Sequence, residues 1–128
     1  TDMPEEYTAL VTALKALQQV EDLTANPPVM VTLPMAEDGW DTRPETVSYG
    51  FVTLDYEVDA LHGDNRKVAT AYEGGVQLYS MARNGAGWVE LITAALTEHC
   101  ESCWSLNYHT YERDTGLFHW EWTFQVEG

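Results

Sequence analysis

The chain has 128 residues, and its 21 Asp and Glu side chains against 6 Lys and Arg give a formal net charge of −15. Because contacts with phosphate depend on Lys and Arg, this balance disfavours ordinary nucleic-acid binding and docking on an anionic membrane. The length suits one domain, residues 1–128, and an aromatic content of 12% is not that of a disordered chain.

No run of apolar residues approaches the ~20 needed to cross a bilayer. The start, TDMPEEYTAL, lacks the basic flank and apolar stretch of a signal peptide. We therefore expect the protein to be made and kept inside a cell, where its two cysteines would be reduced thiols.

Helical spacing predicts a first helix over residues 5–20. Pro4 suits the first helical turn, and acidic side chains follow it at the positive end of the helix dipole. One stripe of this helix is apolar: Tyr7, Leu10, Val11, Leu14 and Leu17. Two prolines then interrupt the pattern, residues 29–33 are typical of a short strand, and we expect residues 34–46 to form a polar loop around Trp40.

A strand over residues 47–61 contains the most regular alternation in the chain, FVTLDYEVDA. Its second face carries Thr53, Asp55, Glu57 and Asp59. Carboxylates two residues apart on a strand lie about 7 Å from each other and repel by only about 0.6 kcal/mol in water. Solubility and protection of an open sheet face explain such a ladder adequately, so its role has to come from its context.

The rest of the chain predicts a strand over residues 68–80, a helix over 88–99 and a hairpin of strands 104–111 and 117–126. The Gly74-Gly75 pair indicates a bulge or a close backbone approach. The last strand presents an apolar face whose buried tryptophans should find partners for their indole N–H groups: Phe118, Trp120, Trp122, Phe124 and Val126. The expected fold class is α+β, a mostly antiparallel sheet with two helices packed on one face, ending in a β-hairpin.

The best metal candidate is HCESCW, where Cys100 and Cys103 have the spacing of a zinc half-site beside His99. A structural zinc needs four ligands, and a second CxxC is missing. His109 and His119, placed on the polar side of the final hairpin, could complete a set, but buried thiols at a helix end are the simpler interpretation. His62 lies in a turn, and NGAG lacks the lysine and glycine spacing of a nucleotide loop. We expect no catalytic residues, cofactor or metal, and therefore no enzyme.

Three stretches, KVATAYEGGVQLYS, WVELITAALTEHC and YHTYERDTGLFHWEWTFQVEG, resemble the small tail-terminator and tail-completion (minor tail) proteins of phages and prophages of Gram-positive bacteria. The likeness covers most of residues 68–128; the opening helix and NPPVMVTLP match more loosely, and residues 37–45 not at all. Its motifs are structural and carry no catalytic signature.

The resemblance implies a viral structural protein of the virion tail, assembled in the host cytoplasm as a homo-oligomeric ring. Such a ring caps the tail tube and joins it to the head connector, so its partners are the major tail tube protein and the head-tail connector proteins. DNA passes through without specific binding. Asp55, Glu57 and Asp59 are then candidates for the lining of the passage, because carboxylates repel phosphate.

The net charge also fits a second class of protein, an acidic DNA mimic that inhibits a host defence protein. A small metabolic enzyme is a third alternative, without a supporting motif. Light scattering separates the first two, since a ring former should have a multiple of the 14.4 kDa chain mass.

Overall fold

The computed structural model describes residues 4–63, 66–101 and 103–127, with side chains except those of residues 56–70 and 127. In chain order the elements are α1 (Glu5–Lys15), β1 (Gln18–Asp22), β2 (Val29–Thr32), β3 (Met35–Glu37), β4 (Ser48–Gly63), β5 (Arg66–Ser80), a 3-10 turn (Gly85–Gly87), α2 (Trp88–Cys100), β6 (Trp104–Glu112) and β7 (Leu117–Glu127).

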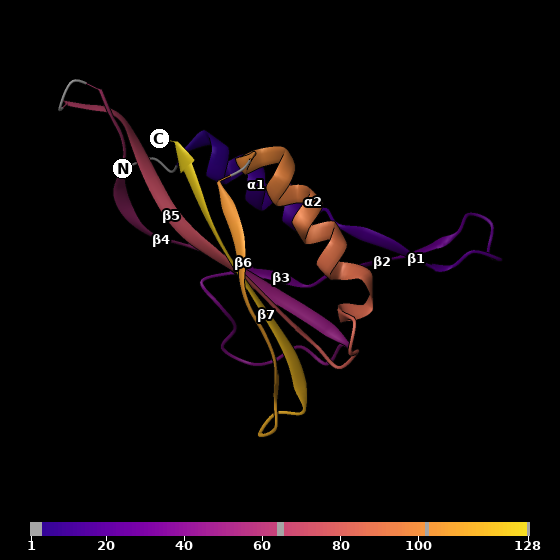
Figure 1. Cartoon of the computed structure of the whole chain (residues 1–128). Helices are drawn as coiled ribbons and strands as arrows, with labels where there is room; N and C mark the ends of the chain where they lie inside the picture. The colour runs from indigo at the N-terminus through magenta and orange to yellow at the C-terminus, as the bar shows by residue number, and fades with distance from the viewer. Residues whose placement is uncertain (1–3, 64–65, 102, 128) are drawn as a thin grey trace.

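Five strands form the main sheet in the order β3-β4-β5-β7-β6. All neighbours in it are antiparallel except β3, which pairs with β4 in parallel. The prediction of a loop is therefore wrong for the residues of β3. Both helices lie on one face of this sheet (Figure 1). The expected α+β class is therefore confirmed, with a closing hairpin of β6 and β7.

The core fills the space between the helices and one face of the sheet. Four residues of the predicted apolar stripe are buried on α1, Tyr7, Leu10, Val11 and Leu14, whereas Leu17 lies beyond the helix end and is half-buried. The ring of Tyr7 stacks on that of Phe124 with centroids 6.2 Å apart. Trp122 and Phe124 are at most 1% exposed, which confirms the apolar face of β7. The buried Trp122 indole N–H, however, has no hydrogen-bond partner among the described residues, so the expectation of a partner is wrong there.

Helix α1 ends at Lys15, five residues before the predicted end. Residues Gln18–Asp22 instead form β1, which pairs antiparallel with β2. This pairing occurs because the prolines between the two segments turn the chain back, and strand hydrogen bonds then replace further helical ones. The prediction of helix through residues 16–20 is therefore wrong.

A bulge in β4 explains the Gly74-Gly75 pair. Leu54 lies opposite Gly74 and Tyr56 opposite Glu73, so Asp55 is an extra residue without a partner on β5. A Cβ atom on Gly74 would collide with the Thr53 carbonyl oxygen and lie 2.6 Å from the Phe124 ring. The close backbone approach predicted for the pair is confirmed.

A second bulge, in β6, exchanges the two faces of that strand. The register shifts between Leu106 and Tyr108, after which Tyr108 lies opposite Glu121 and His109 opposite Trp120. His109 therefore stacks on Trp120, with ring centroids 4.5 Å apart. Because Trp120 faces the helices, the prediction that His109 shares the polar side with His119 is wrong.

Candidate interaction surfaces

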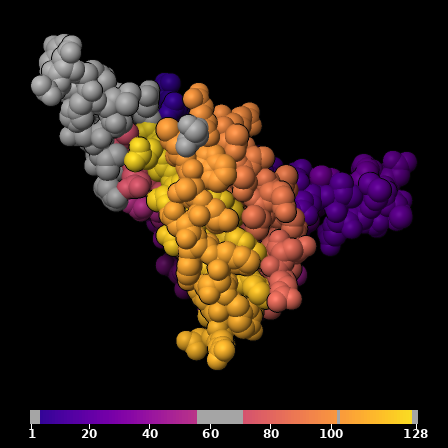
Figure 2. Space-filling model, viewed as in Figure 1, coloured from indigo at the N-terminus to yellow at the C-terminus, as the bar shows by residue number. Residues whose placement is uncertain are grey.

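Strands β1 and β2 form a separate two-stranded sheet, here called the arm, that projects from the body of the molecule (Figures 1 and 2). Every residue of β2 is exposed. Large apolar side chains of the arm are exposed by 39% to 76%: Val20, Leu23, Val29, Met30 and Val31. Three of these are consecutive, so they occupy both faces of the strand.

The root of the arm is fixed to the body. The Gln19 side-chain amide donates to the Ala86 carbonyl oxygen at 2.9 Å, and the Leu33 N–H donates to the Leu17 carbonyl oxygen at 3.4 Å. A groove of about 300 Å³ follows the root, with Val31 and Val47 among its lining residues. Val47 is itself 55% exposed, so the apolar surface of the arm continues onto the body.

An isolated two-stranded hairpin is marginally stable in water, and an exposed apolar patch of this kind marks an interaction site. Among the described elements, no third strand pairs with the arm. The arm and the groove at its root are therefore a candidate interaction surface. This surface was not predicted from the sequence, although the mostly apolar run Val29–Thr32, which follows two prolines, pointed to it.

The sheet face away from the helices carries a row of stacked rings. Tyr49, Tyr79 and His119 are direct partners across β4, β5 and β7. Ring centroids are 5.3 Å apart for the two tyrosines and 4.2 Å for Tyr79 and His119. Phe51 stacks on Tyr79 at 6.1 Å, and Tyr108 meets His119 edge-on at 4.9 Å. This face is therefore aromatic rather than simply polar.

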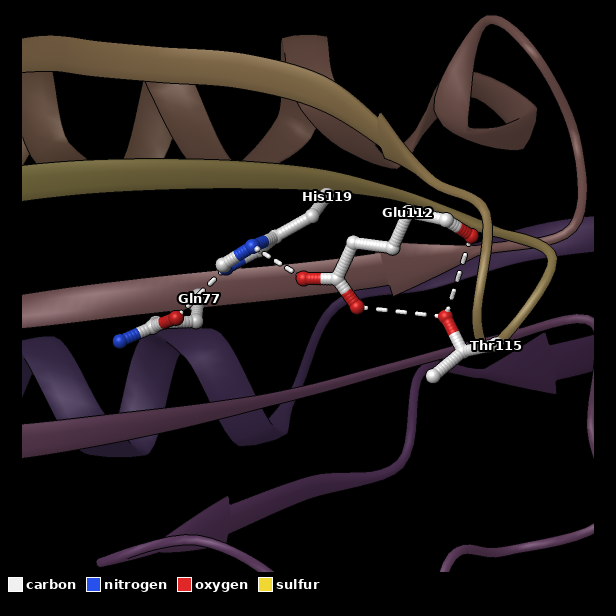
Figure 3. A network of polar contacts seen from close by, with 4 residues as sticks. All are labelled: Gln77, Glu112, Thr115 and His119. Carbon is white, nitrogen blue, oxygen red and sulfur yellow. Dashed lines mark hydrogen bonds and ion pairs between the residues drawn. The ribbon is translucent and has the colours of Figure 1, made fainter.

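His119 is buried within this row and has polar neighbours on both ring nitrogens (Figure 3). Its Nε2 lies 2.6 Å from Gln77 Oε1, and its Nδ1 lies 3.1 Å from Glu112 Oε2, a close contact without hydrogen-bond alignment. The Thr115 hydroxyl donates to the other oxygen of Glu112 at 3.2 Å. Burial lowers the pKa of His119 more than the two nearby carboxylates raise it.

A cleft of about 280 Å³ opens between this row and the loop that follows β3. The Trp40 indole N–H donates to the Gly50 carbonyl oxygen at 3.0 Å, which holds the loop across the sheet face. Burial, reinforced by the charge of Glu112, raises the pKa of Tyr79 to about 12. We call the cleft between the ring row and this loop the aromatic cleft. Its lining residues are Trp40, Asp41, Arg43, Tyr49, Phe51, Tyr79 and Glu112.

Of the acidic ladder, only Asp55 has a described side chain. It is exposed, and the Thr53 hydroxyl donates to it at 2.9 Å. The side chains of Glu57 and Asp59 lie outside the described residues, although their backbone positions pair with Tyr72 and Thr70. The bulge at Asp55 interrupts the alternation from which the ladder was inferred. The lining role of the three carboxylates stays a prediction.

The two thiols lie at the end of α2. Cys100 is buried, Cys103 is exposed, and neither forms a disulfide. Burial, with a smaller contribution from Glu6, raises the pKa of the Cys100 thiol to about 12. The described residues contain no group of three His, Cys, Asp or Glu side chains that could hold a metal ion.

No protein-family model matches the chain, and no curated protein is significantly similar to it in sequence. Neither of the described helices is long and apolar enough to cross a membrane. The assignment of a function therefore depends on the geometry and charge of the surfaces described above.

Proposed function

We propose that this protein is a structural subunit of a phage tail, the tail-terminator or tail-completion protein that caps the tail tube and joins it to the head connector. The observation that carries the proposal is the arm, because a projecting ribbon with apolar residues on both faces suits a subunit that functions in an assembly. The fold class agrees with the one that the sequence resemblance implies, which is support by analogy only.

Charge favours strand β2 of the arm, rather than β1 with its Glu21 and Asp22, as the contact between copies. Each copy carries −15, so copies repel unless they meet through surfaces of low charge. Strand β2 has no charged residue, and its exposed side chains can bury apolar area on a neighbour. A copy that receives the arm of one neighbour and extends its own arm to the next makes a head-to-tail contact, which closes into a ring when the rotation permits.

The acidic surface suits a passage for DNA, since carboxylates repel phosphate and release no counterions on contact. In this proposal DNA passes the ring without specific binding, with Asp55, Glu57 and Asp59 as the candidate lining. The tail tube protein and the connector proteins are the partners on the two sides of the ring.

The molar mass in solution, measured by light scattering over a range of concentrations, tests the role of the arm. We expect a multiple of 14.4 kDa for the parent protein and a return to the monomer for Met30→Ser. Leu106→Ser is the matched control, because Leu106 on β6 is also 45% exposed and lies outside the arm. The control should keep the parental mass.

The same variants in the phage that carries the gene test the tail assignment itself. Met30→Ser should give tails of uncontrolled length or tails that do not join heads, whereas Leu106→Ser should give normal tails. Normal, head-joined tails in the absence of the protein would refute the proposal. A monomer that captures a basic host protein, without effect on tails, would instead favour the DNA-mimic alternative.

A further inference from the structure

The aromatic cleft is independent of the arm and has walls of two chemical kinds. Trp40, Phe51 and Tyr79 supply aromatic rings, and Asp41 and Glu112 supply carboxylates. Its volume of about 280 Å³ is at the lower limit of ordinary ligand pockets, which measure roughly 300–1,000 Å³. The cleft therefore has room for one side chain of a partner rather than for a large ligand.

The charges of the cleft select the sign of its occupant. The lining includes two carboxylates and one guanidinium, that of Arg43, and the faces of aromatic rings present negative electrostatic potential. The whole chain adds a field of the same sign through its net charge of −15. Apart from Arg43, each of these features attracts a cation and opposes a phosphate or carboxylate ligand.

We propose that the aromatic cleft binds the guanidinium group of an arginine side chain presented by a basic partner protein. The flat guanidinium stacks on an aromatic ring and donates paired hydrogen bonds to a carboxylate, so it matches both kinds of wall at once. A lysine ammonium is a compact and more strongly hydrated charge that matches the carboxylates alone. The inference goes beyond the proposed tail function and does not depend on it.

Arg43 provides a sharp test of the sign of the site. Its side chain lines the cleft. Its positive charge also lowers the pKa of Tyr49, but burial has the larger effect, so the pKa of Tyr49 is raised overall. A resident cation opposes an incoming one, so its removal should strengthen the binding of arginine. A site for anions would respond in the opposite direction.

The probe is the short peptide acetyl-Gly-Arg-Gly-amide, followed by nuclear magnetic resonance on the folded protein. The readout is the Trp40 indole N–H signal, which the Trp40→Phe variant assigns. We expect a saturable shift of this signal with the arginine peptide and weaker binding of the lysine peptide. The citrulline peptide, which keeps the shape but not the charge, should give no saturable shift. Equal binding of the citrulline and arginine peptides would overturn the proposal.

Variants of the protein separate the cleft from general attraction to an acidic chain. Asp41→Asn, Glu112→Gln and Phe51→Leu should each weaken arginine binding about two- to fivefold, the range of exposed ion-pair and cation–ring contacts. Arg43→Gln should strengthen it by a similar factor. Glu90→Gln on α2, exposed and on the helix side, is the matched control for charge and should change little. Equal weakening by Glu90→Gln and Asp41→Asn, or weakening by Arg43→Gln, would overturn the proposal.

Discussion

The rings of Tyr79 and His119 stack with centroids 4.2 Å apart and planes inclined by only 11°. The two residues are 40 positions apart in the chain and meet because β5 and β7 place them directly opposite each other. The stack covers the imidazole ring, and the His119 side chain is only 8% exposed. Desolvation of this kind penalises the charged form of histidine.

His119 should therefore make folding stability depend on pH. Its pKa in the folded protein lies below the ordinary value of 6.5, so the unfolded chain takes up the proton first as the pH falls. The stabilisation from neutral His119 is fully present above the unfolded pKa and is lost as the pH falls through 6.5 toward the lower folded value. Urea unfolding of the parent and of His119→Gln, from about pH 8 to about pH 5, measures the difference. That difference should shrink on acidification; growth would mean that Glu112 stabilises the imidazolium more than burial opposes it.

The glycine pair in β5 offers a test with its own control. Gly74→Ala should destabilise the protein by about 1–3 kcal/mol or more, since the new methyl group collides with the Thr53 carbonyl oxygen and the Phe124 ring. At Gly75 the nearest atom, the Trp122 carbonyl oxygen, lies 3.3 Å from an added Cβ, so Gly75→Ala should cost less than about 1 kcal/mol. Chemical denaturation compares the two, and equal costs would contradict the bulge opposite Gly74.

Trp122 combines a fully buried ring with an indole N–H that has no hydrogen-bond partner in the described part of the chain. Trp122→Ala should cost about 3–5 kcal/mol, as for other buried aromatic residues replaced by alanine. Trp122→Phe should cost much less, because it keeps most of the packing and removes a buried donor that forms no hydrogen bond. Free energies of unfolding in urea check both values. A parental stability for Trp122→Ala would mean that the aromatic face of β7 is not the core.

The two thiols should react very differently although they are only three positions apart in the chain. Cys103 is exposed, whereas Cys100 is buried and its pKa is raised to about 12. At about pH 8 a thiol-specific reagent should therefore modify Cys103 in the folded protein and reach Cys100 only after unfolding, because the thiolate is the reactive form. Mass spectrometry counts the modified sites, and Cys103→Ser is the control. Fast modification of Cys100 in folded Cys103→Ser would contradict its burial.

The parts of the fold that local periodicity specifies were predictable. The apolar stripe of α1 and the alternation in β7 decide which faces are buried, and both predictions are confirmed. The arm was not predictable in this way, because residues 16–20 continue the helical spacing and only pairing with β2 converts them into a strand. Here a nonlocal pairing overrides a local preference.

The surfaces that carry the proposals depend on register, which the sequence specifies weakly. The bulges near Asp55 and Asn107 each shift the register by one residue and so exchange the faces of the residues that follow. Without knowledge of the bulge in β6, the separation of His109 from His119 could not be foreseen. The meeting of Tyr79 with His119 depends instead on the regular register between β5 and β7. The composition of β5 gave a partial signal, since Gln77 and Tyr79 alternate with buried Val76 and Leu78.

The acidic ladder gives the prediction that separates the candidate functions. Changing Asp55, Glu57 and Asp59 together to Asn, Gln and Asn nearly preserves shape and removes three negative charges. If these residues only solvate a strand, stability should rise slightly through relief of repulsion. If they line a DNA passage, rings should still assemble, but tails should join heads poorly or eject DNA slowly in a phage complementation assay. If they mimic phosphates, affinity for a basic host partner should collapse with no effect on tails.

The tail proposal predicts the second of these outcomes. A variant with the same loss of charge elsewhere is the matched control, built from exposed positions: Glu90→Gln, Glu98→Gln and Asp114→Asn. Slow ejection in the ladder variant and not in the control would locate the effect in the ladder rather than in the net charge, because DNA repulsion falls off within a Debye length of about 8 Å at physiological salt. Normal plaques and normal ejection in the ladder variant would reject the lining role while leaving the arm, and with it the tail proposal, to its own test.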